Sequence, residues 1–139
     1  MKEDEKEEEG REVYRSFEIA GGQHHSVFCV SGCVYVCGRK EYGRLGLGKE
    51  SGEPSVPTKI NDPTSVRTVG AGGACSFAVT DSGELFSWGM GTNLQLGMSE
   101  EEDVWTPTQV AGKKIENRRI LAVSSGGQHT AVLVSQDDT

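Results

Sequence analysis

Residues 20–46 read AGGQHHSVFCVSGCVYVCGRKEYGRLG, and residues 71–97 repeat this pattern as AGGACSFAVTDSGELFSWGMGTNLQLG. A shift of 51 residues superimposes the two stretches without a gap, so that the Ala-Gly-Gly, Ser-Gly and Leu-Gly groups coincide. Self-similarity at one fixed period is typical of repeat proteins, in which a single unit cannot bury its apolar face alone. We therefore expect neighbouring units of this chain to pack against each other.

A third copy begins near the end of the chain, where Gly126-Gly127-Gln128-His129 repeats Gly21-Gly22-Gln23-His24 letter for letter. The repeat predicts four segments: an acidic disordered tail at 1–14, one repeat at 15–68, a second at 69–122, and a partial third at 123–139.

The residue pattern of each unit indicates β-structure. Short apolar or β-branched runs flank Ser-Gly turn pairs, and the predicted strands are 25–30, 34–36, 58–60, 66–69, 76–80, 85–88, 108–110 and 120–123. About four strands per unit of some 50 residues favours an all-β fold of β-propeller blades. Propellers need roughly four to eight blades. The sequence therefore predicts an incomplete β-propeller, with two blades and the start of a third.

Composition excludes some classes of protein. The chain has 139 residues and a formal net charge of −7, of which residues 1–12 carry −4 through seven acidic and three basic side chains. The remaining residues are almost balanced, so charge favours neither a nucleic-acid surface nor its absence. The longest uncharged stretch, 19–38, is broken by glycines and two histidines, so we expect no transmembrane segment.

The four cysteines predict no metal centre. Cys29, Cys33 and Cys37 are spaced Cys-x₃-Cys-x₃-Cys, and Cys75 stands apart, whereas zinc sites use Cys-x₂-Cys pairs. We expect reduced thiols that pack as small apolar groups. No Ser/His/Asp or Cys/His set has the spacing of a nucleophilic site, so the sequence predicts no covalent chemistry, cofactor or small-molecule substrate.

Three motifs carry a resemblance to a known family. The segments 21–27 (GGQHHSV), 41–48 (EYGRLGLG) and 87–97 (SWGMGTNLQLG) resemble the regulator of chromosome condensation repeat. Residues 104–107, 116–118 and 124–130 resemble the C-terminal end of sequences in this family. The similarity covers about residues 16–134, and the order and spacing of the motifs make it specific.

The resemblance implies a function. It implies a seven-bladed propeller and, for the intact protein, guanine-nucleotide exchange on the small GTPase Ran, with a nuclear location on chromatin through histones and DNA. The blade that inserts a wedge beside the nucleotide has no counterpart here, and an acidic tail replaces the basic one expected. We therefore expect this chain alone to be inactive in exchange.

The resemblance also singles out candidate contacts with the GTPase: Gln23, His24, Gln128 and His129. Because His24 and His129 occupy the same place in the letter-for-letter repeat, their side chains are expected on one face of the ring. The alternative is that these Gln and His side chains bond to neighbouring turn backbones and fix the packing of the blades. For His25 we favour that structural role.

Other prominent residues are expected to be structural. Leu45 and Leu96 should plug the space between blades, and Trp88 and Trp105 should pack there as large apolar anchors. The glycines of 43–48 lack the order and the following helix of a phosphate-binding loop. A basic cluster of Lys113, Lys114, Arg118 and Arg119 could contact DNA phosphates, although a solvated face is the simpler interpretation.

Two classes of function remain open from the sequence. The first is part of a Ran exchange factor. The second is a non-catalytic propeller, either of the regulator of chromosome condensation type or of the kelch type, that serves as a protein-interaction module.

Overall fold

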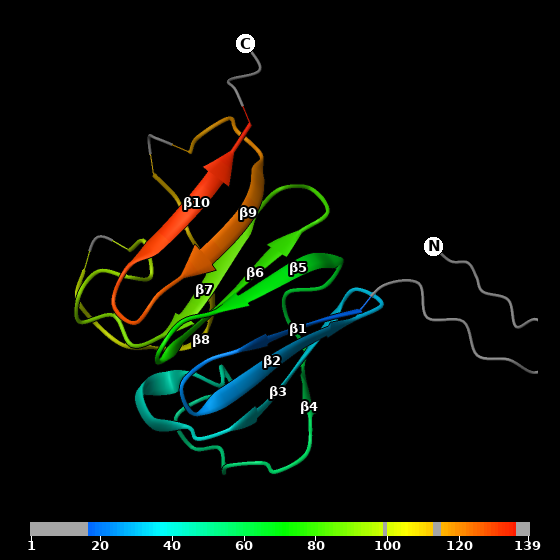
Figure 1. Cartoon of the computed structure of the whole chain (residues 1–139), viewed down its shortest axis with the longest axis vertical. Coiled ribbons are helices and arrows are strands. Elements are labelled where there is room, and N and C mark those ends of the chain that lie inside the picture. Colours follow the sequence, from blue (N-terminus) through cyan, green and yellow to red (C-terminus); the bar gives the residue numbers. More distant parts are fainter. Residues whose placement is uncertain (1–16, 99, 113–114, 136–139) are drawn as a thin grey trace, which may run out of the picture.

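The computed structural model describes residues 17–98, 100–112 and 115–135, and these form three antiparallel β-units (Figure 1). The predicted acidic tail, residues 1–14, lies outside the described residues. The first sheet contains β1 (Phe17–Gly21), β2 (His25–Val30), β3 (Cys33–Gly38) and β4 (Thr58–Ile60) in that order. The second contains β5 (Val66–Ala71), β6 (Cys75–Thr80), β7 (Leu85–Gly89) and β8 (Val104–Gln109). A hairpin of β9 (Ile120–Ser125) and β10 (Thr130–Val134) forms the third unit.

The eight predicted strands are all present, and four strands per complete unit is confirmed. The sequence predicted neither β1 nor β10, and β8 begins four residues before the predicted 108–110. Pro107 is tolerated in β8 because this strand forms the outer edge of its sheet. The predicted repeat boundaries at 68/69 and 122/123 fall inside β5 and β9, whereas the sheets themselves span 17–60 and 66–109.

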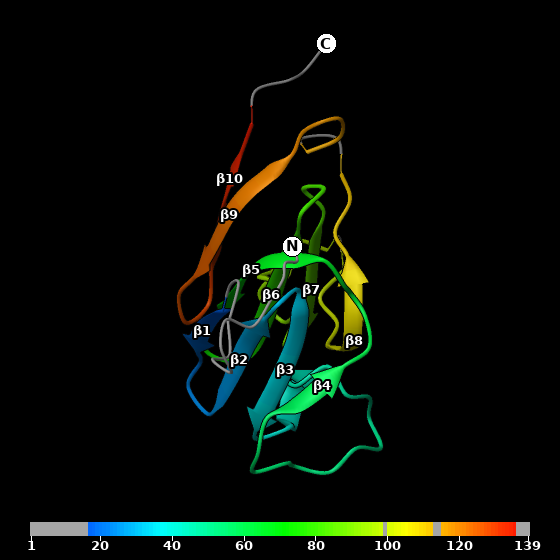
Figure 2. The same ribbon diagram turned by 90° about the vertical axis from the view of Figure 1, so that its right-hand side faces the viewer.

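The three units stack around their first strands. β5 contacts β1 on one side and β9 on the other, and β4 and β8, the last strands of their sheets, lie on the side away from the β9–β10 hairpin (Figure 2). This arrangement of antiparallel sheets is that of propeller blades, and the predicted all-β, incomplete propeller is confirmed.

Burial follows directly from this stacking. All six residues of β6 are buried, since the second sheet has a neighbour on both faces. In β2 only alternate residues are buried, because only one face of the first sheet is covered. The described residues of β10 are half-buried or exposed throughout.

Apolar side chains fill the two interfaces between units. Between the first and second sheets, Val27, Val34 and Leu45 pack in one cluster with Trp88, which is fully buried. Leu96 occupies the corresponding place in the second cluster, with Phe77 and Ile120. Both leucines are 1 % exposed, so their predicted role between blades is confirmed.

Each leucine is delivered by a loop that follows the third strand of its sheet. The first loop begins with the short 3₁₀ turn η1 (Glu41–Gly43) and continues to Gly46. Gly46 has a φ of +71°, and a Cβ there would lie 2.8 Å from the Trp88 ring. This position therefore requires glycine for both its backbone conformation and its close approach.

The two tryptophans differ in burial. Trp88 lies in the core as predicted, whereas Trp105 on β8 is half-buried, with the Lys49 ammonium 5.8 Å from its ring centroid. Its position on the outer strand explains the difference, because that edge has no further strand beside it.

The turns between the second and third strands of the sheets differ by one residue. In the first sheet Val30 pairs with Cys33 across a two-residue turn, in which Ser31 and Gly32 both have positive φ. In the second sheet the backbone of Thr80 bonds to Glu84 across three residues. The two sheets therefore correspond with a shift of 50 residues before this turn and 51 after it, so the ungapped superposition was wrong by one residue over the first two strands.

Removing the leucine between the first two sheets should strongly destabilise the chain. We expect Leu45→Ala to lower the free energy of unfolding by roughly 3 kcal/mol, because a buried leucine is replaced by a cavity. The control is Leu133→Ala on β10, where leucine is 61 % exposed and the cost should stay below about 0.5 kcal/mol. Urea unfolding followed by tryptophan fluorescence measures both, and equal costs would contradict the stacking of the core.

Candidate functional site

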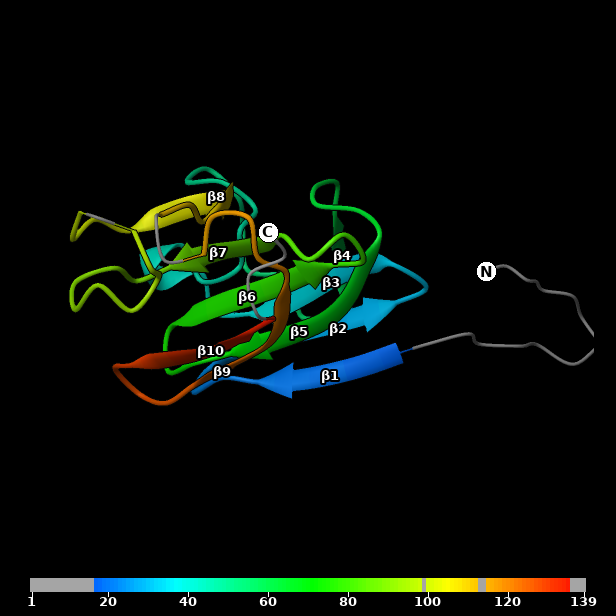
Figure 3. The ribbon, with the colours of Figure 1, turned by 90° about the horizontal axis from the view of Figure 1, so that it is seen from above.

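The turns that join the first two strands of each unit lie side by side at one end of the molecule (Figure 3). We call residues 21–25, 71–75 and 125–129 the near rim. In each turn a glycine N–H donates to a carbonyl three residues later, and the distances are 2.8 Å for Gly22, 2.9 Å for Gly72 and 2.8 Å for Gly126. The three turns therefore have one conformation at one position in their units.

Hydrogen bonds join the near-rim turns to one another. The backbone N–H of Gln23 donates to the carbonyl of Gly73 at 3.1 Å, and the N–H of Gly73 donates to the carbonyl of Gly126 at 3.3 Å. A Cβ on Gly72 would lie 2.5 Å from the Ser125 hydroxyl, so the close approach of the turns requires glycine. The result is a shallow depression of about 470 Å³ with glycine backbone as its floor and the side chains of Gln23 and Gln128 beside it.

All four predicted contact residues are exposed on this rim: Gln23, His24, Gln128 and His129. The second turn offers Ala74 and Cys75 at the corresponding positions, and both are buried. The near rim therefore presents a polar side-chain pair at each outer turn and mainly backbone between them.

The predicted equivalence of His24 and His129 needs a correction. Because Gly22 bonds to His25 as Gly126 bonds to His129, the structural counterpart of His129 is His25, and the counterpart of Gln128 is His24. Aligning the sequences by identity gave the wrong equivalence, because Gly-Gly-Gln-His occurs in both turns but starts one residue earlier in the first, relative to the glycine whose N–H closes the turn. Exposure at both turns keeps His24 and His129 as candidate contacts.

His25 is buried between the first two sheets and makes the structural contacts that the sequence favoured. Its Nε2 lies 2.9 Å from the Ser76 hydroxyl, which in turn donates to the backbone carbonyl of Arg44 at 2.8 Å. Because the single hydroxyl proton of Ser76 is directed to Arg44, Nε2 of His25 must carry the proton that Ser76 accepts.

Burial and the nearby Arg44 guanidinium together lower the pKa of His25 from its usual 6.5 to about 4. Burial is the larger cause, because removing the imidazole from water penalises the charged form. His25 is therefore neutral at physiological pH, and it acts as a hydrogen-bonding group within the interface.

The next interface repeats this hydrogen bond. The Thr130 hydroxyl donates to the backbone carbonyl of Gln95 at 2.7 Å, and Gln95 precedes Leu96 as Arg44 precedes Leu45. We call this contact the inter-sheet hydroxyl bond. The inter-sheet hydroxyl bond links each Leu-Gly loop to the second strand of the following unit.

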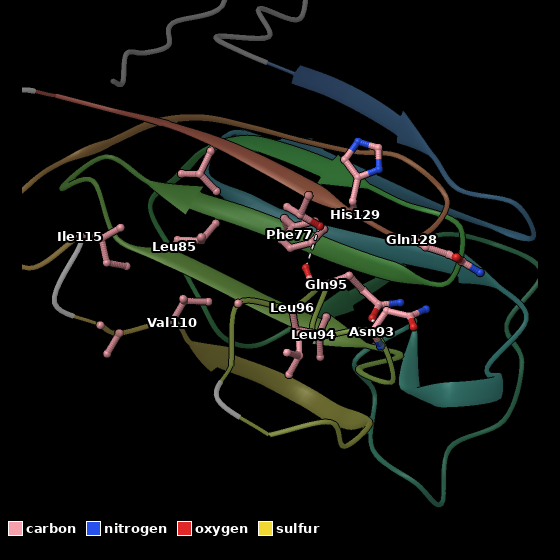
Figure 4. Close-up of a pocket in the computed structure, with 15 residues that line it drawn as sticks. Phe77, Leu85, Asn93, Leu94, Gln95, Leu96, Val110, Ile115, Gln128 and His129 are labelled. Carbon is pink, nitrogen blue, oxygen red and sulfur yellow. Dashed lines mark hydrogen bonds between the residues drawn. The ribbon is translucent and has the colours of Figure 1, made fainter.

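A deeper apolar groove of about 470 Å³ lies beside β10, on the part of the second sheet that the β9–β10 hairpin leaves uncovered (Figure 4). Its walls are Phe77, Leu85, Leu96, Val110 and Ile115. At the rim end Gln128 and His129 join its lining, so the groove opens onto the near rim.

The cysteines pack as predicted. Cys29 and Cys75 are buried and Cys33 and Cys37 half-buried, all with free thiols. Burial raises the pKa of the Cys29 and Cys75 thiols, which keeps them protonated and unreactive.

Within the described ranges, no three His, Cys, Asp or Glu side chains are placed to hold a metal ion, and no helix is long and apolar enough to span a membrane.

Two of the four residues of the predicted basic cluster belong to the described part of the chain. Lys113 and Lys114 lie outside the described residues, and Arg118 and Arg119 are exposed. The Arg119 guanidinium donates to the carbonyls of Asp81 at 2.9 Å and Ser82 at 3.4 Å. Arg119 therefore joins the third unit to the second sheet.

The fold is that of a propeller protein built from repeats. The first turns of its units lie together on one face of the ring (Figure 3). The sequence model of the regulator of chromosome condensation (RCC1) repeat family matches residues 31–79 and 82–133 of this chain. The chain therefore belongs to the RCC1 repeat family.

Similar proteins include several much longer chains. The regulator of chromosome condensation of Xenopus laevis is 56 % identical over 118 residues, which are 84 % of this chain and 28 % of that protein. The human protein of that name is 51 % identical over 121 residues, covering 86 % and 29 %. The chain thus spans less than a third of the length of these relatives.

A solved structure shows the same fold. Prp20p of Saccharomyces cerevisiae, described with its binding properties to Gsp1p and histones, superimposes with a TM-score of 0.78 and 30 % identity over 86 % of this chain and 30 % of Prp20p. The human probable E3 ubiquitin-protein ligase HERC3 is 36 % identical over 115 residues, which are 81 % of this chain and 11 % of HERC3.

The lowered pKa of His25 predicts that acid destabilises the fold. Between pH 6.5 and 4 the unfolded chain binds a proton at His25 that the folded chain does not. The contribution of neutral His25 to the free energy of unfolding is therefore complete above pH 6.5 and is lost as the pH falls toward 4. We expect the free energy of unfolding to fall by about 2 kcal/mol between pH 7 and 5 on account of His25.

Urea unfolding at both pH values measures this change. His25→Asn should remove most of the decrease, whereas His24→Asn, at the exposed neighbouring position, should retain it. An unchanged pH dependence in His25→Asn would rule out the buried imidazole as its source.

Proposed function

We propose that this chain is part of a guanine-nucleotide exchange factor for the small GTPase Ran, which acts in the nucleus on chromatin. The observation that carries the proposal is 56 % identity to the regulator of chromosome condensation of Xenopus over 84 % of this chain. The similarity to Prp20p, described together with its binding properties to Gsp1p and histones, supports the same assignment. Histones and DNA are accordingly the proposed chromatin partners of the intact protein.

The near rim is the proposed docking surface for the GTPase. The glycines of its floor carry no side chains that would prevent close approach of a partner. Polar groups lie around this floor, from Gln23, His24, Gln128 and His129. Hydrogen bonds between the turns hold this surface in one geometry, so little order need be gained on binding.

Exchange by this surface requires no covalent step. A protein that binds the nucleotide-free GTPase more tightly than the loaded form must, by thermodynamic reciprocity, weaken nucleotide binding by the same factor. In this proposal the rim residues supply part of that binding energy. The described residues form only two complete sheets and a hairpin, so we propose that exchange needs the intact ring.

The second candidate is a non-catalytic interaction module. The 36 % identity to HERC3, of which this chain would cover only 11 %, favours it, because there the same repeat serves in a much longer protein of another class. The two candidates differ in one property, which is whether the intact protein accelerates nucleotide release.

Release of a fluorescent nucleotide from Ran by the intact parent protein tests the proposal. We expect His24→Ala combined with His129→Ala to slow release by roughly tenfold or more, which corresponds to a loss of about 1.4 kcal/mol of binding. The control is Thr64→Ala, an exposed residue that precedes β5 at the opposite end of the sheets, which should leave the rate unchanged.

The outcomes separate the two parts of the proposal. If the unmodified parent protein does not accelerate release, the exchange function is wrong and the interaction module stands. If it does accelerate release and the double variant matches its rate, the assignment of the two histidines fails while the exchange function holds.

A further inference from the structure

The outer strands of the two sheets share several local features. Thr58 of β4 and Thr108 of β8 occupy the same position in the strand register. Each donates its hydroxyl to the carbonyl two residues earlier, at 3.1 Å in the first sheet and 3.0 Å in the second. A proline, Pro57 or Pro107, precedes each threonine. These common features belong to the architecture of the repeat.

Three residues near β4 have no counterpart of the same kind near β8. Pro54, Val56 and Lys59 stand where the second sheet has Val104, Thr106 and Gln109. The Val56 side chain is apolar and 65 % exposed, and Lys59 is exposed as well. The loop that leads into β4 lies on the side of the molecule away from the β9–β10 hairpin (Figure 1, Figure 2). The repeat therefore does not require these three residues, and the fold leaves two of them in solvent.

Together they form a recognition motif. Residues 54–59 read PSVPTK, which has the form Pro-x-x-Pro-x-Lys. Because every third residue of a polyproline II helix faces the same way, Pro54 and Pro57 share one side of such a helix. Val56 and Lys59 share a second side. SH3 domains bind Pro-x-x-Pro segments of this conformation in an aromatic-lined groove, and a lysine beyond the second proline adds a charge that a carboxylate can bind.

The segment is weakly held in the fold. The chain bends within it, so a polyproline II conformation requires it to straighten. In the described part of the chain, residues 54–57 make two hydrogen bonds outside the pairing of β4. The carbonyl of Pro54 accepts one from the N–H of Gly38 at 3.1 Å, and the carbonyl of Val56 accepts the other from Thr58. Since β4 pairs with β3 over only three residues, straightening breaks few bonds.

We propose that residues 54–59 bind an SH3-type domain, which offers an aromatic-lined groove beside an acidic pocket. Pro54 and Pro57 enter the groove, and the Lys59 ammonium binds the acidic pocket. β4 is the last strand of its sheet, so this segment stays accessible when further units stack on the faces of the chain. The interaction is independent of both proposed functions.

Titration calorimetry in two steps tests this site. A synthetic peptide of residues 53–60 is first titrated into a panel of purified SH3 domains, and the domains that bind it are then titrated into the intact parent protein. We expect at least one of them to bind the intact protein within about tenfold of its affinity for the peptide, because little order is lost on straightening.

Variants of the intact protein locate the contact. Pro57→Ala and Lys59→Glu should each weaken binding by roughly tenfold or more, since they remove a groove contact and reverse the charge at the acidic pocket. Both positions are exposed, so neither change disturbs the core. Lys59→Arg should retain the affinity. Pro107→Ala and Gln109→Glu are the matched controls at the equivalent positions of β8 and should leave binding unchanged.

Three results would overturn the proposal. The first is that no domain of the panel binds the peptide. The second is that the peptide binds but the intact protein does not, which would mean that the fold withholds the segment. The third is that Pro57→Ala and Lys59→Glu bind as tightly as the unmodified protein, which would place the contact elsewhere.

Discussion

A four-stranded antiparallel sheet has two faces, and in this molecule neither can be left to water without exposing apolar side chains. The second sheet meets this constraint fully, with every residue of β6 buried between neighbours. The first sheet and the hairpin meet it on one face only, which leaves Ile19 and Leu133 more than half exposed. The stability of each unit therefore depends on the unit beside it, and cohesion is a property of neighbouring pairs.

Polar contacts determine how the units are aligned once apolar packing has brought them together. Leucine side chains alone would allow a sheet to slide along its neighbour, because apolar attraction has no direction. Ser76 and Thr130 remove that freedom by binding one particular carbonyl, and His25 adds a neutral imidazole to the first of these contacts. Unpaired, these buried groups would each be costly, so the correct alignment is also the one that satisfies them.

Much of this fold could be predicted from the sequence. The repeated Gly-Gly, Ser-Gly and Leu-Gly groups indicated strands, turns and buried leucines, because each depends on local backbone geometry or on burial. Strand β1 could not be predicted from its pattern, since Phe17 and Ile19 are exposed and Glu18 lies between them. Glu18 is positioned by a partner outside its own sheet, through bonds to Thr68 and the backbone of Val69. The equivalence of His129 and His25 was also missed, because both turns contain Gly-Gly-Gln-His but the motif is offset by one residue relative to the hydrogen bond that closes the turn.

The two ends of the sheets are constrained differently. At the near rim all three turns have the same length, and hydrogen bonds run from Gln23 to Gly73 and from Gly73 to Gly126. At the opposite end the turns after β2 and β6 contain two and three residues. These turns also bond to the following unit, because the N–H of Val66 donates to the carbonyl of Gly32 at 3.0 Å and the N–H of Ile120 donates to the carbonyl of Gly83 at 2.9 Å. The extra residue in the second sheet is therefore accommodated without loss of the bond to the next unit, and a single turn length is a property of the near rim, the surface on which recognition of a partner can depend.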